Sequence, residues 1–71
     1  MNKLTMAFRR REVPVYFERV DVEGDEALIA AYVDGAEEPV TFWVPASLSS
    51  GGREIRRHVR RGVRECYGEE Q

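Results

Sequence analysis

Reactive side chains are scarce in this 71-residue chain. Cys66 is its one cysteine and His58 its one histidine. A single cysteine excludes an internal disulfide bond and a cysteine-rich metal site, and no second histidine is present to complete a metal centre. We therefore expect no metal, no cofactor and a reducing compartment.

Long apolar runs are also missing. No stretch approaches the roughly 20 apolar residues that a membrane-spanning helix needs. Residues 4–8 are too few and too broken to form the core of a signal peptide. These absences predict a cytoplasmic protein that does not associate with membranes.

The composition indicates one small globular domain over residues 1–71. Hydrophobic residues make up 42% of the chain and charged residues 34%, which is typical of a folded rather than a disordered protein. We expect loose order at residues 1–11 and 69–71. Leu4, Met6 and Phe8 alternate with polar or small residues, so a short edge strand is the alternative for the first segment.

Charge is unevenly distributed along the chain, although the formal net charge is only −2. Residues 1–11 carry +4, residues 12–46 carry −8, residues 47–66 carry +4, and the last two acids add −2. Both ends are therefore basic and the middle is acidic.

Three segments are predicted to be β-strands, at residues 13–23, 27–34 and 40–44. The alternation changes phase inside the first of them, which predicts a bulge near Glu18 and Arg19. Pro14 donates no hydrogen bond and favours an edge position or a strand start. Tight turns are predicted at residues 23–26 and 35–39.

The last predicted element is an amphipathic helix over residues 52–67. Wound at 100° per residue, Ile55, Val59, Gly62, Val63 and Cys66 share one face. The predicted fold is α+β: a three-stranded antiparallel β-meander with one C-terminal helix packed on one face, in the order β-β-β-α. Cys66 is expected to be a small buried hydrophobe.

Arginines occupy the other side of this helix, and it contains no lysine. Guanidinium groups make planar, bidentate contacts to carboxylates and phosphates, so this surface predicts binding of an anionic partner. The simplest alternative is a solvated face that keeps the domain soluble. The predicted partner-binding residues are Arg53, Arg56, Arg57, Arg60, Arg61 and Arg64, with Trp43 as an additional anchor.

Trp43 is expected on the sheet face that the helix does not cover, together with Tyr16 and Tyr32. Clustered aromatic residues on an open sheet would suit a homodimer interface or a base-stacking platform, whereas ordinary cross-strand pairing is the simpler interpretation. A homodimer through this face, or through open edge strands, is one expectation.

Catalysis is not expected. The acids lie in turns and strands, and three strands with one helix leave little volume for a substrate cleft of the usual ~300 Å³ or more. The sequence predicts a small non-enzymatic binding or regulatory protein that docks on a larger protein with an acidic surface. A nucleic-acid-binding module that uses the same arginines on phosphates is the alternative, and the acidic middle of the chain argues against it.

Overall fold

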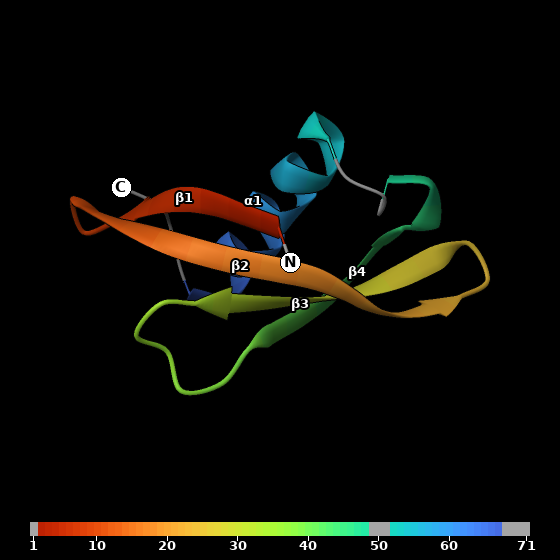
Figure 1. Ribbon diagram of the computed structural model, residues 1–71, viewed down its shortest axis with the longest axis horizontal. Helices are drawn as coiled ribbons and strands as arrows, with labels where there is room; N and C mark the ends of the chain where they lie inside the picture. The colour runs from red at the N-terminus through yellow and green to blue at the C-terminus, as the bar shows by residue number, and fades with distance from the viewer. Residues whose placement is uncertain (1, 49–51, 68–71) are drawn as a thin grey trace.

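The computed structural model describes residues 2–48 and 52–67, so the predicted loose tail at 69–71 lies outside the described part of the chain. Within it, the domain is α+β, with an antiparallel sheet and a C-terminal helix (Figure 1). The elements are β1 (Asn2–Phe8), β2 (Arg11–Glu23), β3 (Glu26–Val33), β4 (Val40–Pro45), a 3₁₀ turn η1 (Ala46–Leu48) and α1 (Arg53–Tyr67).

The expectation of three strands with a loose first segment is wrong, because the sheet has four strands in the order β1-β2-β3-β4. β1 pairs with β2 along its whole length, from Asn2 opposite Phe17 to Phe8 opposite Arg11. The alternation of Leu4 and Met6 is the cause, since both side chains are buried in the core. The alternative of an N-terminal edge strand is therefore the correct one.

The strands follow one another through short connections. Arg9 and Arg10 both have positive φ angles, of 49° and 65°, which is the conformation of a type I′ hairpin turn. The predicted turn at residues 23–26 is present, with Gly24 at a φ of 60°. The pairing of β2 with β3 shifts between Arg19 and Asp21, so the predicted bulge exists one residue further along.

The core lies between the sheet and α1. It joins Leu4 and Met6 of β1, Val15 and Phe17 of β2, and alternate residues of β3 and β4 to Ile55, Val59 and Val63 of the helix. The helical spacing of these three residues is why α1 buries this face. The predicted helix at residues 52–67 is therefore confirmed, with its apolar face as expected except at Cys66, which is exposed. The last turn of α1 is open to solvent, so Cys66 follows the apolar spacing without being covered.

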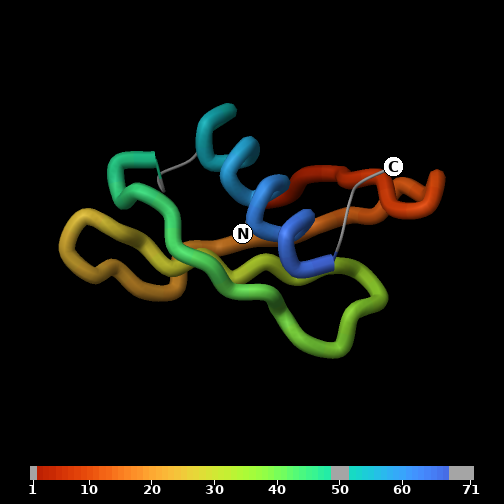
Figure 2. Tube along the Cα trace, turned by 180° about the vertical axis from the view of Figure 1, so that it is seen from behind, coloured from red at the N-terminus to blue at the C-terminus, as the bar shows by residue number. Residues whose placement is uncertain are grey.

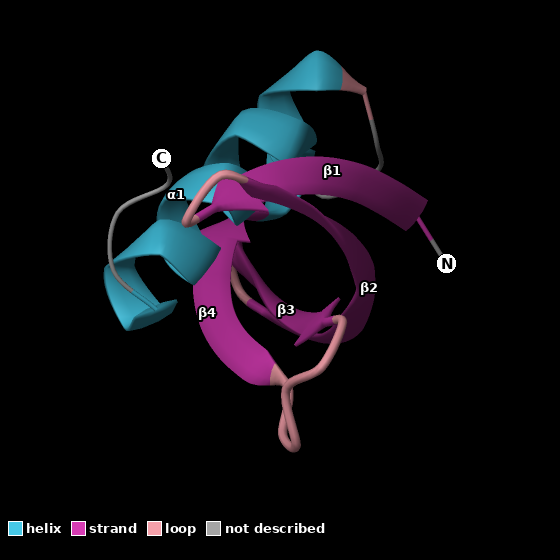
Figure 3. Cartoon of the chain, turned by 90° about the vertical axis from the view of Figure 1, so that its left-hand side faces the viewer, coloured by secondary structure: helices cyan, strands magenta, loops and turns pink. Residues whose placement is uncertain are grey.

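The sheet is strongly curled, and α1 lies in the opening between its two edge strands, β1 and β4 (Figures 2 and 3). The helix thereby borders both strands that lack a second neighbour, which is one way in which proteins limit edge-to-edge pairing. The β2–β3 hairpin extends beyond the helix (Figure 1), and Val20 and Val22 are accordingly exposed there.

Gly62 allows α1 to approach β4 closely. A Cβ atom added at this position would lie 2.7 Å from Cγ and Cδ1 of the Phe42 ring. Gly62→Ala should therefore lower the free energy of unfolding by up to about 2 kcal/mol, because overpacking costs ~1–3 kcal/mol and exceeds the gain of about 1 kcal/mol in helix propensity. Urea unfolding of the single variant and of Gly62→Ala with Phe42→Leu measures this. With the smaller side chain at position 42, the added methyl group should no longer clash, so alanine at position 62 should be neutral or stabilising. If Gly62→Ala alone stabilised the protein, the close approach of α1 to β4 would be contradicted.

Substitution of Val59 tests which face of α1 packs against the sheet. This residue is fully buried, whereas Arg61, on the other side of the same helix, is exposed. Val59→Ala should cost on the order of 1–3 kcal/mol through lost burial and an unfilled space. Arg61→Ala should change the free energy of unfolding by less than about 0.5 kcal/mol. Thermal melts that ranked the two variants in the opposite order would show that the helix faces are wrongly assigned.

Candidate functional site

The arginine face of α1 consists of five residues on the side of the helix away from the core. Burial of Ile55, Val59 and Val63 fixes the helix and therefore the direction of this face. Four of its side chains are exposed and one, Arg60, is half-buried. The members of the arginine face are Arg53, Arg57, Arg60, Arg61 and Arg64.

One ion pair on this face has a defined geometry. Arg57 Nη1 lies 3.8 Å from Glu54 Oε2, and both side chains are more than half exposed. Exposed pairs of this kind contribute only about 0–1 kcal/mol to stability. Glu54 therefore does little to restrict Arg57, which can exchange this pair for contacts with another anion.

Arg56 lies apart from the arginine face, although it is one of the predicted partner-binding residues. Its Nη2 donates a hydrogen bond of 3.4 Å to the carbonyl oxygen of Lys3 in β1, and its Nη1 donates one of 3.5 Å to the carbonyl oxygen of Gly52. The guanidinium carbon also lies 5.8 Å from the centre of the Phe17 ring. Arg56 thus connects the helix to β1, which is a structural role.

Trp43 does not join the arginines, because it lies on the opposite side of the sheet from α1. It is 44% exposed, and it lies opposite Leu28 on β3. A single flat partner surface cannot contact Trp43 and the arginine face together. The set of contact residues expected from the sequence therefore divides between two surfaces.

Tyr16 and Tyr32 lie on the same sheet face as Trp43, as predicted, and they are direct cross-strand neighbours. Trp43 is further away, because its neighbour Leu28 precedes Tyr32 by four residues, or roughly 13 Å along an extended strand. Ala30 and Thr41 occupy the row between them. The aromatic residues therefore form a tyrosine pair and a separate tryptophan.

Carboxylates accompany these rings, and the sequence argument did not identify this arrangement. Among the paired residues of the described strands, the register places five acids on this side of the sheet and one cation, Lys3. We call this surface, away from α1, the open sheet face. Its acids are Glu12, Glu18, Asp21, Glu23 and Glu26. The arginine face of α1 and these five acids thus lie on opposite sides of the sheet.

Two polar contacts organise the tyrosine pair. The Tyr32 hydroxyl donates a hydrogen bond of 3.0 Å to Glu18 Oε2. This bond, together with desolvation and the nearby negative charge, raises the pKa of Tyr32 above its usual value. On the other side of the pair, Lys3 Nζ lies 6.0 Å from the centre of the Tyr16 ring, at the limit for a cation–π contact.

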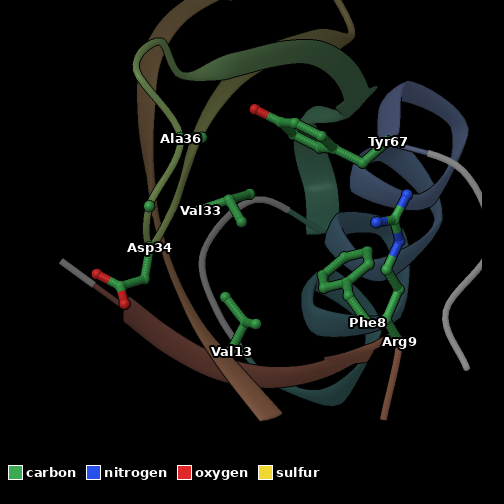
Figure 4. Close-up of a pocket in the computed structure, with 8 residues that line it drawn as sticks. Phe8, Arg9, Val13, Val33, Asp34, Ala36 and Tyr67 are labelled. Atoms are coloured by element: carbon green, nitrogen blue, oxygen red, sulfur yellow. The ribbon is translucent and has the colours of Figure 1, made fainter. Parts of the chain in front are cut away.

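A recess of about 470 Å³ opens where the β1–β2 turn, the β3–β4 connection and the end of α1 meet. The expectation of little volume for a cleft is therefore wrong, because β1 and its turn supply an additional wall. Figure 4 shows Phe8, Val13, Val33 and Tyr67 around it, with Arg9 and Asp34 on opposite sides. The charged groups do not meet across the recess, so they form no acid–base pair.

The described residues offer no grouping of side chains for metal chemistry. Within residues 2–48 and 52–67, no three His, Cys, Asp or Glu side chains are grouped so that they could hold a metal ion. His58 is half-buried on α1. No helix in the described part of the chain is both long and apolar enough to cross a membrane.

No family model, curated protein or solved structure matches this chain.

Proposed function

We propose that this protein is a small non-enzymatic binding protein that docks on a larger protein through the arginine face of α1. The observation that carries the proposal is the placement of five guanidinium groups on one side of a helix whose other side is fixed by the core. A helix held in this way presents its side chains with little loss of backbone freedom on binding. Arginine is also among the residues that most often dominate the energy of protein interfaces.

An acidic protein surface fits this face in charge and in chemistry. A carboxylate can accept two parallel hydrogen bonds from one guanidinium group. The helix has 15 residues and is therefore roughly 22 Å long, a length that suits a local contact with a cluster of acids. The open sheet face, which is acidic, would then point away from the partner.

Nucleic acid is the second candidate, and one observation favours it. Arg9, in the β1–β2 turn, and Tyr67, at the end of α1, line the same recess. The basic segment formed by the turn residues Arg9 and Arg10 and by Arg11 at the start of β2 therefore lies near the C-terminal end of the helix, where it could extend a path for phosphates. The acidic open sheet face opposes this mode, since it would repel a strand that wraps around the domain.

Capture of partners from a lysate of the source organism, with and without nuclease, tests the proposal. We expect mass spectrometry to identify a protein that survives nuclease treatment and whose own surface is acidic. Loss of all captured material after nuclease treatment would instead support the second candidate. Duplex binding would then weaken with salt, with a slope of roughly −0.9 per phosphate contacted.

A further inference from the structure

We infer that the open sheet face is a second binding surface, specific for an arginine-rich peptide segment. This goes beyond the proposed function, which uses the opposite side of the molecule and an acidic partner. Three aromatic side chains on this face are each more than one third exposed: Tyr16 at 39%, Tyr32 at 37% and Trp43 at 44%. Trp43 lies opposite Leu28, whereas the tyrosine pair lies beside Glu18, and four further carboxylates share this face.

The combination of rings and carboxylates selects a cation. Guanidinium groups stack on aromatic rings and also form bidentate hydrogen bonds with carboxylates, so one arginine can satisfy both. A cation of the chain itself already approaches a ring on this face, since Lys3 Nζ lies 6.0 Å from the centre of the Tyr16 ring. A neutral apolar partner would leave the acids without counter-charges, which is costly on desolvation.

Two directly opposed carboxylates lie at the Trp43 end of the open sheet face. Glu23 and Glu26 face each other directly across the β2–β3 hairpin, and Glu26 is in turn opposite Pro45, two residues from Trp43. Like charges in directly opposed positions destabilise a sheet. A cation bound between them would remove this repulsion and could stack on the indole ring nearby.

A second copy of this chain is a less suitable occupant. Two open sheet faces brought together would oppose five acids to five acids, with one lysine on each side. A head-to-tail contact of this face with the arginine face of another copy matches in charge. However, the two faces lie on opposite sides of the domain, so that contact would not close into a dimer.

Fluorescence anisotropy of a labelled nona-arginine peptide tests the inference at low salt, where exposed charges are weakly screened. Trp43→Ala should weaken binding about threefold to tenfold, through loss of one cation–π contact. A nona-lysine peptide of equal charge should bind less tightly, because ammonium groups do not stack as planes. Equal affinity for the two peptides, or no effect of Trp43→Ala, would overturn the inference.

Matched double variants separate this site from general attraction to a protein of net negative charge. Glu23→Gln with Glu26→Gln should reduce the affinity by about fivefold or more, whereas Glu37→Gln with Glu38→Gln, in the β3–β4 connection, should change it less than about twofold. Equal effects of the two pairs would overturn the inference. So would sedimentation that showed a dimer dissolved by Trp43→Ala, since a second copy would then occupy the face.

Discussion

Met6→Ala is expected to lower the free energy of unfolding by about 2–5 kcal/mol, the range for removal of a large core side chain. Met6 is 1% exposed and lies in the core with Leu4, Val15 and Phe17. Truncation removes this burial and leaves a space that the sheet cannot close without distorting β1. Urea unfolding of the purified variant measures the loss.

Thr5→Ala is the control on the same strand. Thr5 is exposed and lies opposite Pro14 on the side of the sheet away from α1. Its replacement should change the free energy of unfolding by no more than about 0.5 kcal/mol. If Met6→Ala were as mild as Thr5→Ala, β1 would not belong to the folded core, and the segment would be as loose as its sequence alone suggests.

Replacement of Arg57, Arg61 and Arg64 by glutamate should abolish capture of an acidic protein partner. These three side chains are exposed members of the arginine face, so the fold should survive. The substitution converts three positive charges into three negative ones at the contact. Loss of one member of a buried, hydrogen-bonded charge pair at an interface costs ~2–5 kcal/mol, so three such changes should remove binding in a pull-down. Circular dichroism should show that the helix is retained.

A second triple variant has the same change of charge at a different place. In it, Arg9 and Arg10 of the β1–β2 turn and Arg11 at the start of β2 are replaced by glutamate. This variant should still dock a protein on α1. If the protein instead binds nucleic acid along both basic regions, either triple variant should bind it more weakly, and the affinity should depend less steeply on salt. If the helix variant kept every binding activity of the wild type, the arginines would serve only solubility.

Much of the fold could be predicted because its local patterns agree with its tertiary structure. The helix follows from the spacing of Ile55, Val59 and Val63, and its predicted bounds differ from the structure by one residue. The bulge in β2 follows from a change in alternation, and the turn at Gly24 follows from a glycine among acids. Each of these signals depends on a few neighbouring residues.

The first strand was harder to predict for a physical reason. Pro14 favours an edge position or a strand start for β2, and the alternation of Leu4, Met6 and Phe8 is too short to exclude a loose segment. In the structure, the register of β2 with β3 begins at Val15, so Pro14 lies just beyond that ladder and its missing N–H breaks no pairing there. β1 could then add on the other side, with Thr5 opposite Pro14.

The two charged faces could be predicted only in part. Helical spacing predicts that the arginines of α1 share one side of the helix. It does not show that Arg56 donates a hydrogen bond to the carbonyl oxygen of Lys3, which is 53 positions away. The acids of the open sheet face are spread over two strands and a bulge, so their common side depends on the register. Cys66 is exposed rather than buried, because helical periodicity does not show where the sheet that covers the helix ends.

The sequential order of the strands also bears on how the domain forms. Each strand pairs with its neighbour in the chain, so every hairpin closes a short loop, and low contact order of this kind favours rapid folding. The contact of α1 with β1, through Arg56 and Lys3, instead joins the two ends of the described chain. We expect this contact to form after the transition state of folding. Weakening it should therefore accelerate unfolding and leave the folding rate almost unchanged.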